Sequence, residues 1–87
     1  MEKKLSEMDF DEEGTVKEID ENLKKQVAGM GIRVGKNIRM ATKQPIKGPV
    51  VVEVDKSLTS LGLGIAEKII VEVGQDENLI DGASERG

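Results

Sequence analysis

Cysteine and histidine are both absent from the 87-residue sequence. Their absence excludes disulfides and the imidazole and thiolate ligands of most zinc and haem sites. It also excludes Ser–His–Asp and Cys–His catalytic groups. The candidate ligands that remain for a transition metal are carboxylates and four methionines, so Fe(II) binding would be weak or would need ligands from a partner. We therefore expect no catalytic residue, no metal ligand set and no bound cofactor in this chain.

Aromatic residues are almost absent, because Phe10 is the only one. Grooves that bind proline-rich peptides and platforms that bind single-stranded nucleic acid both depend on stacked aromatic rings. Gly29, Gly31 and Gly35 do not form a phosphate-binding loop, since they lie where a predicted helix ends and do not open one. We therefore expect no nucleic-acid partner and no enzymatic activity. Binding to a partner protein is the function that we predict.

Long apolar runs are missing as well. The N-terminal residues contain no stretch as long as a signal peptide, and no segment approaches the length of a membrane span. Together with the lack of cysteine, these absences predict a cytoplasmic protein that does not insert into a membrane. At this length we expect one small folded domain, present as a monomer.

Charge is abundant and unevenly distributed. Residues 1–20 carry a net charge of −5, residues 21–60 carry +5 and residues 61–87 carry −4. From Asn22 to Val52 there are seven basic residues and no acidic one. Two interpretations stay open: ordinary solvated faces that keep the domain soluble, or a basic patch that meets an acidic protein surface. For the second, the candidate contact residues are Arg33, Arg39, Lys43 and Lys47.

Short alternating apolar segments predict a chain made mostly of strands. The expected strands are Gly14–Ile19, Lys36–Lys43, Val50–Asp55, Ser57–Leu63 and Ile69–Val73. In the third and last strands, the alternate Val and Ile residues are expected to face the core. In the second, Ile38, Met40 and Thr42 are expected to share one face.

Helical periodicity is confined to one segment. Leu23, Val27 and Met30 form one apolar stripe and predict a helix over roughly Glu21–Met30, which Gly31 ends in the left-handed conformation. A helical turn is also expected at Ile65–Lys68. Five short strands, with one short helix between the first and the second, predict a mostly β fold and a small β-barrel. The predicted domain spans residues 1–73, and residues 74–87 are expected to form a disordered tail.

Four segments, in this order, carry a resemblance to a known family. They are the Gly-Thr-Val start of the first strand, MGIRVG at residues 30–35, PIKGPVVVEV at residues 45–54 and AEKIIVE at residues 66–72. The opening segment up to Glu13 is a lead-in to the first strand, and its residues Leu5–Met8 are similar to the start of that family too. On these segments the chain resembles the FeoA family over residues 5–73.

The resemblance implies an SH3-like β-barrel and a role in bacterial ferrous iron uptake. FeoA proteins are described as cytosolic regulatory partners of FeoB, the membrane GTPase that moves Fe(II), and no catalytic residue is carried over from them. The resemblance therefore implies a non-catalytic accessory protein that binds a FeoB-type transporter. The same fold is similar to the C-terminal domain of iron-dependent repressors, which leaves a transition-metal-binding or metal-sensing domain as the alternative.

Overall fold

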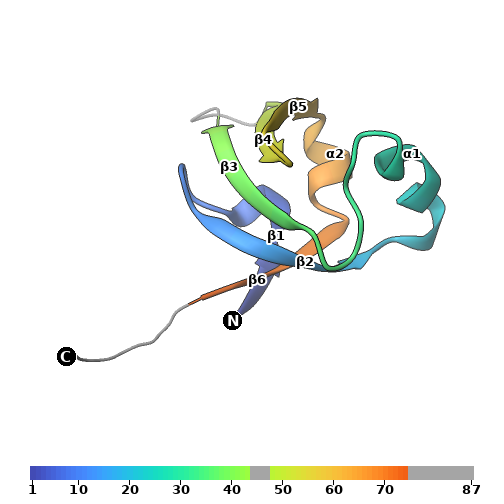
Figure 1. Ribbon diagram of the computed structural model, residues 1–87, viewed down its shortest axis with the longest axis horizontal. Helices are drawn as coiled ribbons and strands as arrows, with labels where there is room; N and C mark the ends of the chain where they lie inside the picture. The colour runs from blue at the N-terminus through green and yellow to red at the C-terminus, as the bar shows by residue number, and fades with distance from the viewer. Residues whose placement is uncertain (44–47, 75–87) are drawn as a thin grey trace.

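The structure is a computed structural model that describes residues 1–43 and 48–74 of the chain. Within those ranges the chain forms one antiparallel sheet of six strands in the order β1-β6-β2-β3-β4-β5 (Figure 1). The strands are β1 (Glu2–Lys4), β2 (Glu13–Ile19), β3 (Asn37–Lys43), β4 (Val50–Val54), β5 (Ser57–Leu61) and β6 (Ile69–Val73). The helices are α1 (Lys24–Ala28) and α2 (Leu63–Ala66), with short 3₁₀ turns at Leu5–Glu7 and Glu21–Leu23.

The predicted mostly β class is confirmed, and all five predicted strands are present, although the fourth ends at Leu61, two residues earlier than predicted. The sheet is curved but not closed, because β1 and β5 are two separate edges, so it is a barrel only in a loose sense. The sixth strand, β1, was not predicted: its three residues are charged and show no apolar alternation. The second helix begins at Leu63, two residues before the predicted turn, because Ala66 and Ile65 donate their N–H groups back to the Gly62 carbonyl.

Two of the sequence predictions fall on residues that the structure does not describe. The expected tail lies almost entirely within residues 75–87, and the candidate contact residue Lys47 lies within residues 44–47. Among the described residues, no helix has the length and apolar character needed to cross a membrane.

The core lies on the inner side of the curved sheet. Val50, Val52 and Val54 of β4 are buried, as are Ile69, Val71 and Val73 of β6, so the predicted alternation is confirmed in both strands. The lead-in closes one side of this core through Leu5 and Met8, which are both fully buried.

The prediction for Thr42 is wrong. It is exposed although Ile38 and Met40 on the same strand are buried. The pairing between β3 and β4 shifts by one residue between Met40 and Thr42. A shift of this kind turns the following side chains to the other face of the sheet.

A close approach at Gly14 fixes how β2 lies against β6. A Cβ atom added to Gly14 would lie 2.4 Å from a methyl group of Val71 and 2.6 Å from the Glu72 carbonyl oxygen. Only glycine therefore fits at this position, where the two paired strands approach each other closely. Farther along, the register of β2 against β6 shifts between Val16 and Glu18, and this β-bulge lets Val16 and Ile19, three residues apart, both face the core.

Candidate functional site

Arg39 lies at the centre of the charged outer face of the sheet. It stands opposite Glu53 of β4 and opposite Glu13 of β2 in the strand register. Its Nε donates to Glu53 Oε1 at 2.8 Å, and its Nη1 donates to Asp11 Oδ1 at 2.8 Å. The hydrogen bond to Glu53, and to a smaller extent the one to Asp11, raises the pKa of the Arg39 guanidinium above its ordinary value. Arg39 therefore joins the lead-in to two strands of the sheet.

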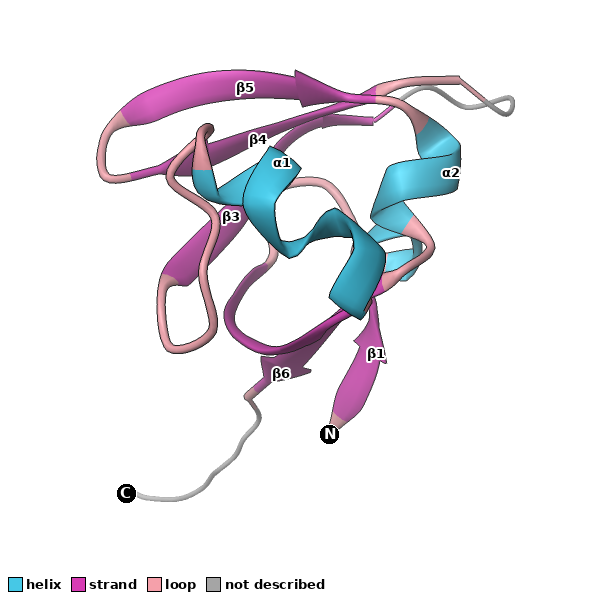
Figure 2. Cartoon of the chain, turned by 90° about the vertical axis from the view of Figure 1, so that its right-hand side faces the viewer, coloured by secondary structure: helices cyan, strands magenta, loops and turns pink. Residues whose placement is uncertain are grey.

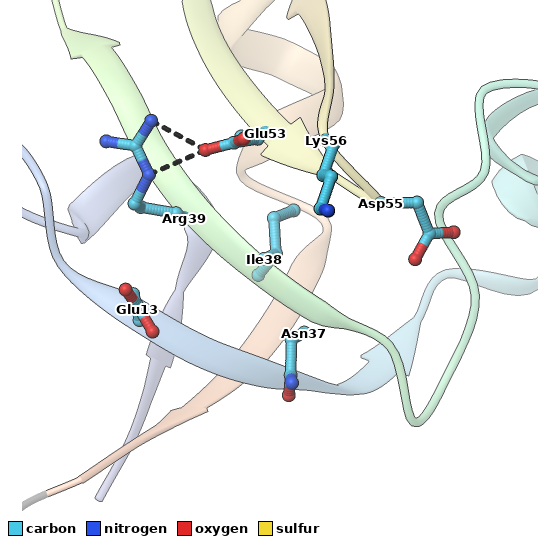
Figure 3. A pocket seen from close by; sticks show the side chains of 7 residues that line it. All are labelled: Glu13, Asn37, Ile38, Arg39, Glu53, Asp55 and Lys56. Atoms are coloured by element: carbon cyan, nitrogen blue, oxygen red, sulfur yellow. Dashed lines mark hydrogen bonds and ion pairs between the residues drawn. The ribbon is translucent and has the colours of Figure 1, made fainter.

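The same face carries a shallow depression of about 180 Å³ beside Arg39 (Figure 3). Figure 3 shows the Arg39 guanidinium directed at Glu53, with Asp55 and Lys56 from the β4–β5 turn at the other end. The residues that line the depression are Glu13, Asn37, Ile38, Arg39, Glu53, Asp55 and Lys56. In the part of the chain that the structure describes, no three acidic side chains are placed to hold a metal ion together. The depression thus offers charged and polar contacts on an open surface.

Lys43 points from the end of β3 towards the lead-in. Its Nζ donates to the Met8 carbonyl oxygen at 2.9 Å. Its positive charge also contributes to a lowered pKa of Glu12. Two of the predicted contact residues, Arg39 and Lys43, are therefore on one strand and bonded to the segment Met8–Asp11 of the same chain.

Arg33 lies apart from these two residues, in the loop between α1 and β3. It lines a second depression of about 280 Å³, whose other lining residues are Ile19, Lys24, Ala28, Ile32 and Val34. Arg33 is exposed, and no carboxylate among residues 1–43 and 48–74 forms an ion pair with it. Its neighbour Val34 is 56% exposed. The sequence did not single out Val34, because its exposure depends on the fold and the sequence shows only a valine between Arg33 and Gly35.

The loop that carries Arg33 is anchored at both ends. At its start, the Ile32 N–H donates to the Val27 carbonyl and the Gly31 N–H to the Ala28 carbonyl, each at 3.0 Å. These are the two bonds of the Schellman motif, and they require the left-handed conformation of Gly31, whose φ is 84°. At its end, Lys36 Nζ lies 2.8 Å from Asp55 Oδ2 in the β4–β5 turn. The predicted set is thus divided between this loop and β3, while Lys47 lies outside the described residues.

Comparison with known proteins points to one family. The sequence model of the FeoA domain matches residues 3–73. A solved structure of an iron uptake regulatory protein (FeoA) is 28% identical, with a TM-score of 0.78 over 84% of this chain and 99% of that one. A FeoA-like protein from Clostridium acetobutylicum is 23% identical, with a TM-score of 0.73 over 99% of this chain and 96% of that one.

A different class of protein shares the fold. A manganese-dependent transcriptional repressor is 23% identical, with a TM-score of 0.76 over 83% of this chain and 41% of the repressor. At this identity the likeness shows the fold alone. No curated protein matches the chain.

Proposed function

The chain belongs to the FeoA domain family, and on that premise we propose that it is a non-catalytic accessory protein of ferrous iron uptake that binds the FeoB-type membrane GTPase transporter. Family membership supports the role in Fe(II) uptake. The observation that carries the proposal is the match over residues 3–73, together with the 28% identity to a protein described as an iron uptake regulatory protein.

The surface around Arg33 supports binding as the mode of action. The exposed guanidinium of Arg33 can donate two hydrogen bonds to a carboxylate. The partly exposed Val34 and the apolar walls of the depression beside it offer an apolar contact. Protein interfaces commonly combine apolar contacts with arginine in this way. We therefore place the main contact with an acidic surface of the transporter at Arg33.

Arg39 and Lys43 have a smaller part in this proposal. A partner carboxylate at Arg39 would compete with Glu53 and Asp11, which already accept hydrogen bonds from it. A partner at Lys43 would compete with the Met8 carbonyl. Lys47 remains in the proposed contact set on its charge alone.

The metal-sensing alternative has less support. The likeness to the manganese-dependent repressor is a likeness of fold. The acidic side chains of residues 1–43 and 48–74 form no group able to hold a metal ion. A site built from those described residues would therefore need ligands from a partner to hold Fe(II).

An amide-resolved NMR titration with the soluble cytosolic GTPase portion of the transporter tests the proposal. We expect shifts in the loop Gly31–Lys36 and its neighbours, and we expect Arg33→Glu to weaken binding by about tenfold because an attractive charge becomes repulsive. Lys25→Glu is the matched control: Lys25 is exposed on α1 but does not line the depression. Equal effects of the two substitutions would remove Arg33 from the site, and an absence of binding would overturn the proposed function.

A further inference from the structure

The two edges of the sheet have opposite characters. β1 has three residues, all charged: Glu2, Lys3 and Lys4. The Lys3 Nζ is held by Glu12 Oε1 at 3.1 Å, so a charged side chain is fixed near this edge. Short, charged edge strands discourage pairing with other chains. β1 is therefore a protected edge.

β5 lacks each of these protections. Its residues, Ser57–Leu61, include no charge and no proline, and they pair with β4 along their whole length without a register shift. Outside that ladder, no backbone hydrogen bond involves β5 in the described part of the chain. Because an antiparallel edge strand directs alternate N–H and C=O groups away from its neighbour, β5 presents a row of free donors and acceptors. In Figure 2, β5 runs along the upper margin of the molecule.

One exposed apolar side chain, Leu58, lies beside this row. Leu58 is 66% exposed and lies opposite Glu53 in the register of β4 and β5. Val51, two residues from Glu53, is its diagonal neighbour and is only half-buried. An added strand would therefore cover Leu58 with the side chain that it places next to it.

The charge at the start of β5 indicates which end of an added strand is acidic. Lys56 is exposed in the β4–β5 turn, and no ion pair involves it in residues 1–43 and 48–74. An acidic residue at that end of an added strand would complement it.

A second copy of the chain fits this edge poorly. Antiparallel pairing of two β5 strands about Thr59 would place Lys56 opposite Gly62 of the other copy, which has no charge to offer. Contact through five residues also falls well short of the roughly 1,200 Å² that specific interfaces between folded domains bury. An extended segment meets neither difficulty, because it can carry an acidic residue and continue past the ends of β5.

We propose that β5 is a docking edge at which an extended segment of the transporter adds as a further strand. The segment is uncharged where it pairs, places an apolar residue beside Leu58 and has an acidic residue near Lys56. This inference rests on the proposed function, since it takes the transporter as the partner. The two surfaces suit one partner, because the Arg33 loop is tied to the β4–β5 turn through Lys36 and Asp55.

Hydrogen exchange of the full chain, alone and with the full-length transporter in nanodiscs, tests the inference. We expect the amides of β5 to exchange at least about tenfold more slowly in the complex, because strand addition gives its free N–H groups new acceptors. We also expect Leu58→Lys to weaken binding by about tenfold through loss of an apolar contact. Phe10→Lys is the matched control: Phe10 is 70% exposed but belongs to the segment before β2 and not to β5.

The possible outcomes separate the two proposals. Binding without protection of β5, or equal losses for Leu58→Lys and Phe10→Lys, overturns the docking edge and leaves the proposed function standing. Protection of β5 that rises with chain concentration in the absence of transporter assigns the edge to a second copy and also overturns the inference. If the wild-type chain does not bind the transporter at all, the proposed function and the inference both fail.

Discussion

Glu12 shows how a single side chain holds the lead-in against the sheet. Its Oε1 accepts the Asp9 N–H at 2.9 Å and Lys3 Nζ at 3.1 Å. Partial burial raises the pKa of the Glu12 carboxyl, but the bonds from Asp9 and Lys3 and the charges of Lys3 and Lys43 outweigh it, and the net pKa lies below the ordinary value of 4.5. The ionised form of Glu12 is therefore stabilised by folding.

Replacing Glu12 by glutamine makes this contribution measurable. Because the pKa is lower in the folded state, the stabilisation is present above the unfolded-state pKa and is lost as the pH falls through the folded-state pKa. We expect Glu12→Gln to lower the free energy of unfolding by about 1 kcal/mol at neutral pH. The difference from wild type should shrink as the pH falls below 4.5. Urea denaturation at several pH values measures both quantities.

A suitable control for this experiment is Glu18→Gln. Glu18 is exposed, and no ion pair involves it among the described residues. The control should change stability little at any pH. A loss for Glu12→Gln that stays constant down to low pH would contradict the assigned role of the charge.

The charges also show what the sequence could and could not predict about the candidate site. The run of basic residues from Asn22 to Val52 drew attention to Arg33, which is exposed and free of ion pairs with the described residues, and its part in binding stays a prediction. The same run could not show that Arg39 is bonded to Asp11, because the two are 28 residues apart and meet only when β3 folds beside the lead-in. An uneven distribution of charge along a sequence can thus become a set of ion pairs within the fold.

At the scale of elements, the end of α1 depends on two glycines with opposite requirements. Gly29 has helical dihedral angles, and a Cβ atom added there would be 3.5 Å from the Gln26 carbonyl oxygen, an ordinary contact. Gly31 has a φ of 84°, in the left-handed region that side chains disfavour. Alanine is therefore compatible with the first position and strained at the second.

Alanine substitutions at these two positions should change the free energy of unfolding in opposite directions. We expect Gly29→Ala to raise the free energy of unfolding by about 0.5–1 kcal/mol, because alanine loses less backbone entropy in a helix. We expect Gly31→Ala to lower it by about 1 kcal/mol, because it forces a side chain into the left-handed region. Chemical denaturation midpoints measure both effects. A destabilising Gly29→Ala would show that α1 requires a residue without a side chain at that position.

Element prediction succeeded where a local pattern was strong. β4 and β6 have alternating apolar residues, and both were predicted with the correct inward faces. β1 was missed because Glu2, Lys3 and Lys4 become a strand only by pairing with β6, 66 or more residues away. Thr42 was placed on the wrong face because a register shift depends on the partner strand and leaves no mark on the alternation itself.

At the scale of the whole molecule, the N-terminal residues determine which strand lies at the edge of the sheet. β1 covers β6 through the pairs Glu2–Glu72, Lys3–Val71 and Lys4–Ile70, and the Val73 N–H donates to the Met1 carbonyl at 2.8 Å. Without β1, the edge of the sheet would be β6, whose sequence is IIVEV. That edge would be much more apolar than β5, since four of the five residues of β6 have branched aliphatic side chains.

Deletion of residues 1–4 tests whether β1 acts as this cover. Loss of the pairing should lower the melting temperature by several degrees, and the exposed β6 edge should make the chain associate as its concentration rises. Thermal denaturation and light scattering after gel filtration measure the two effects, with Lys4→Gln as a control that removes a charge but keeps β1 in place. A truncated chain that stays monomeric at high concentration would show that β6 tolerates being an edge. Association of the truncated chain but not of the wild type would show that β1 shields β6 from pairing with other chains.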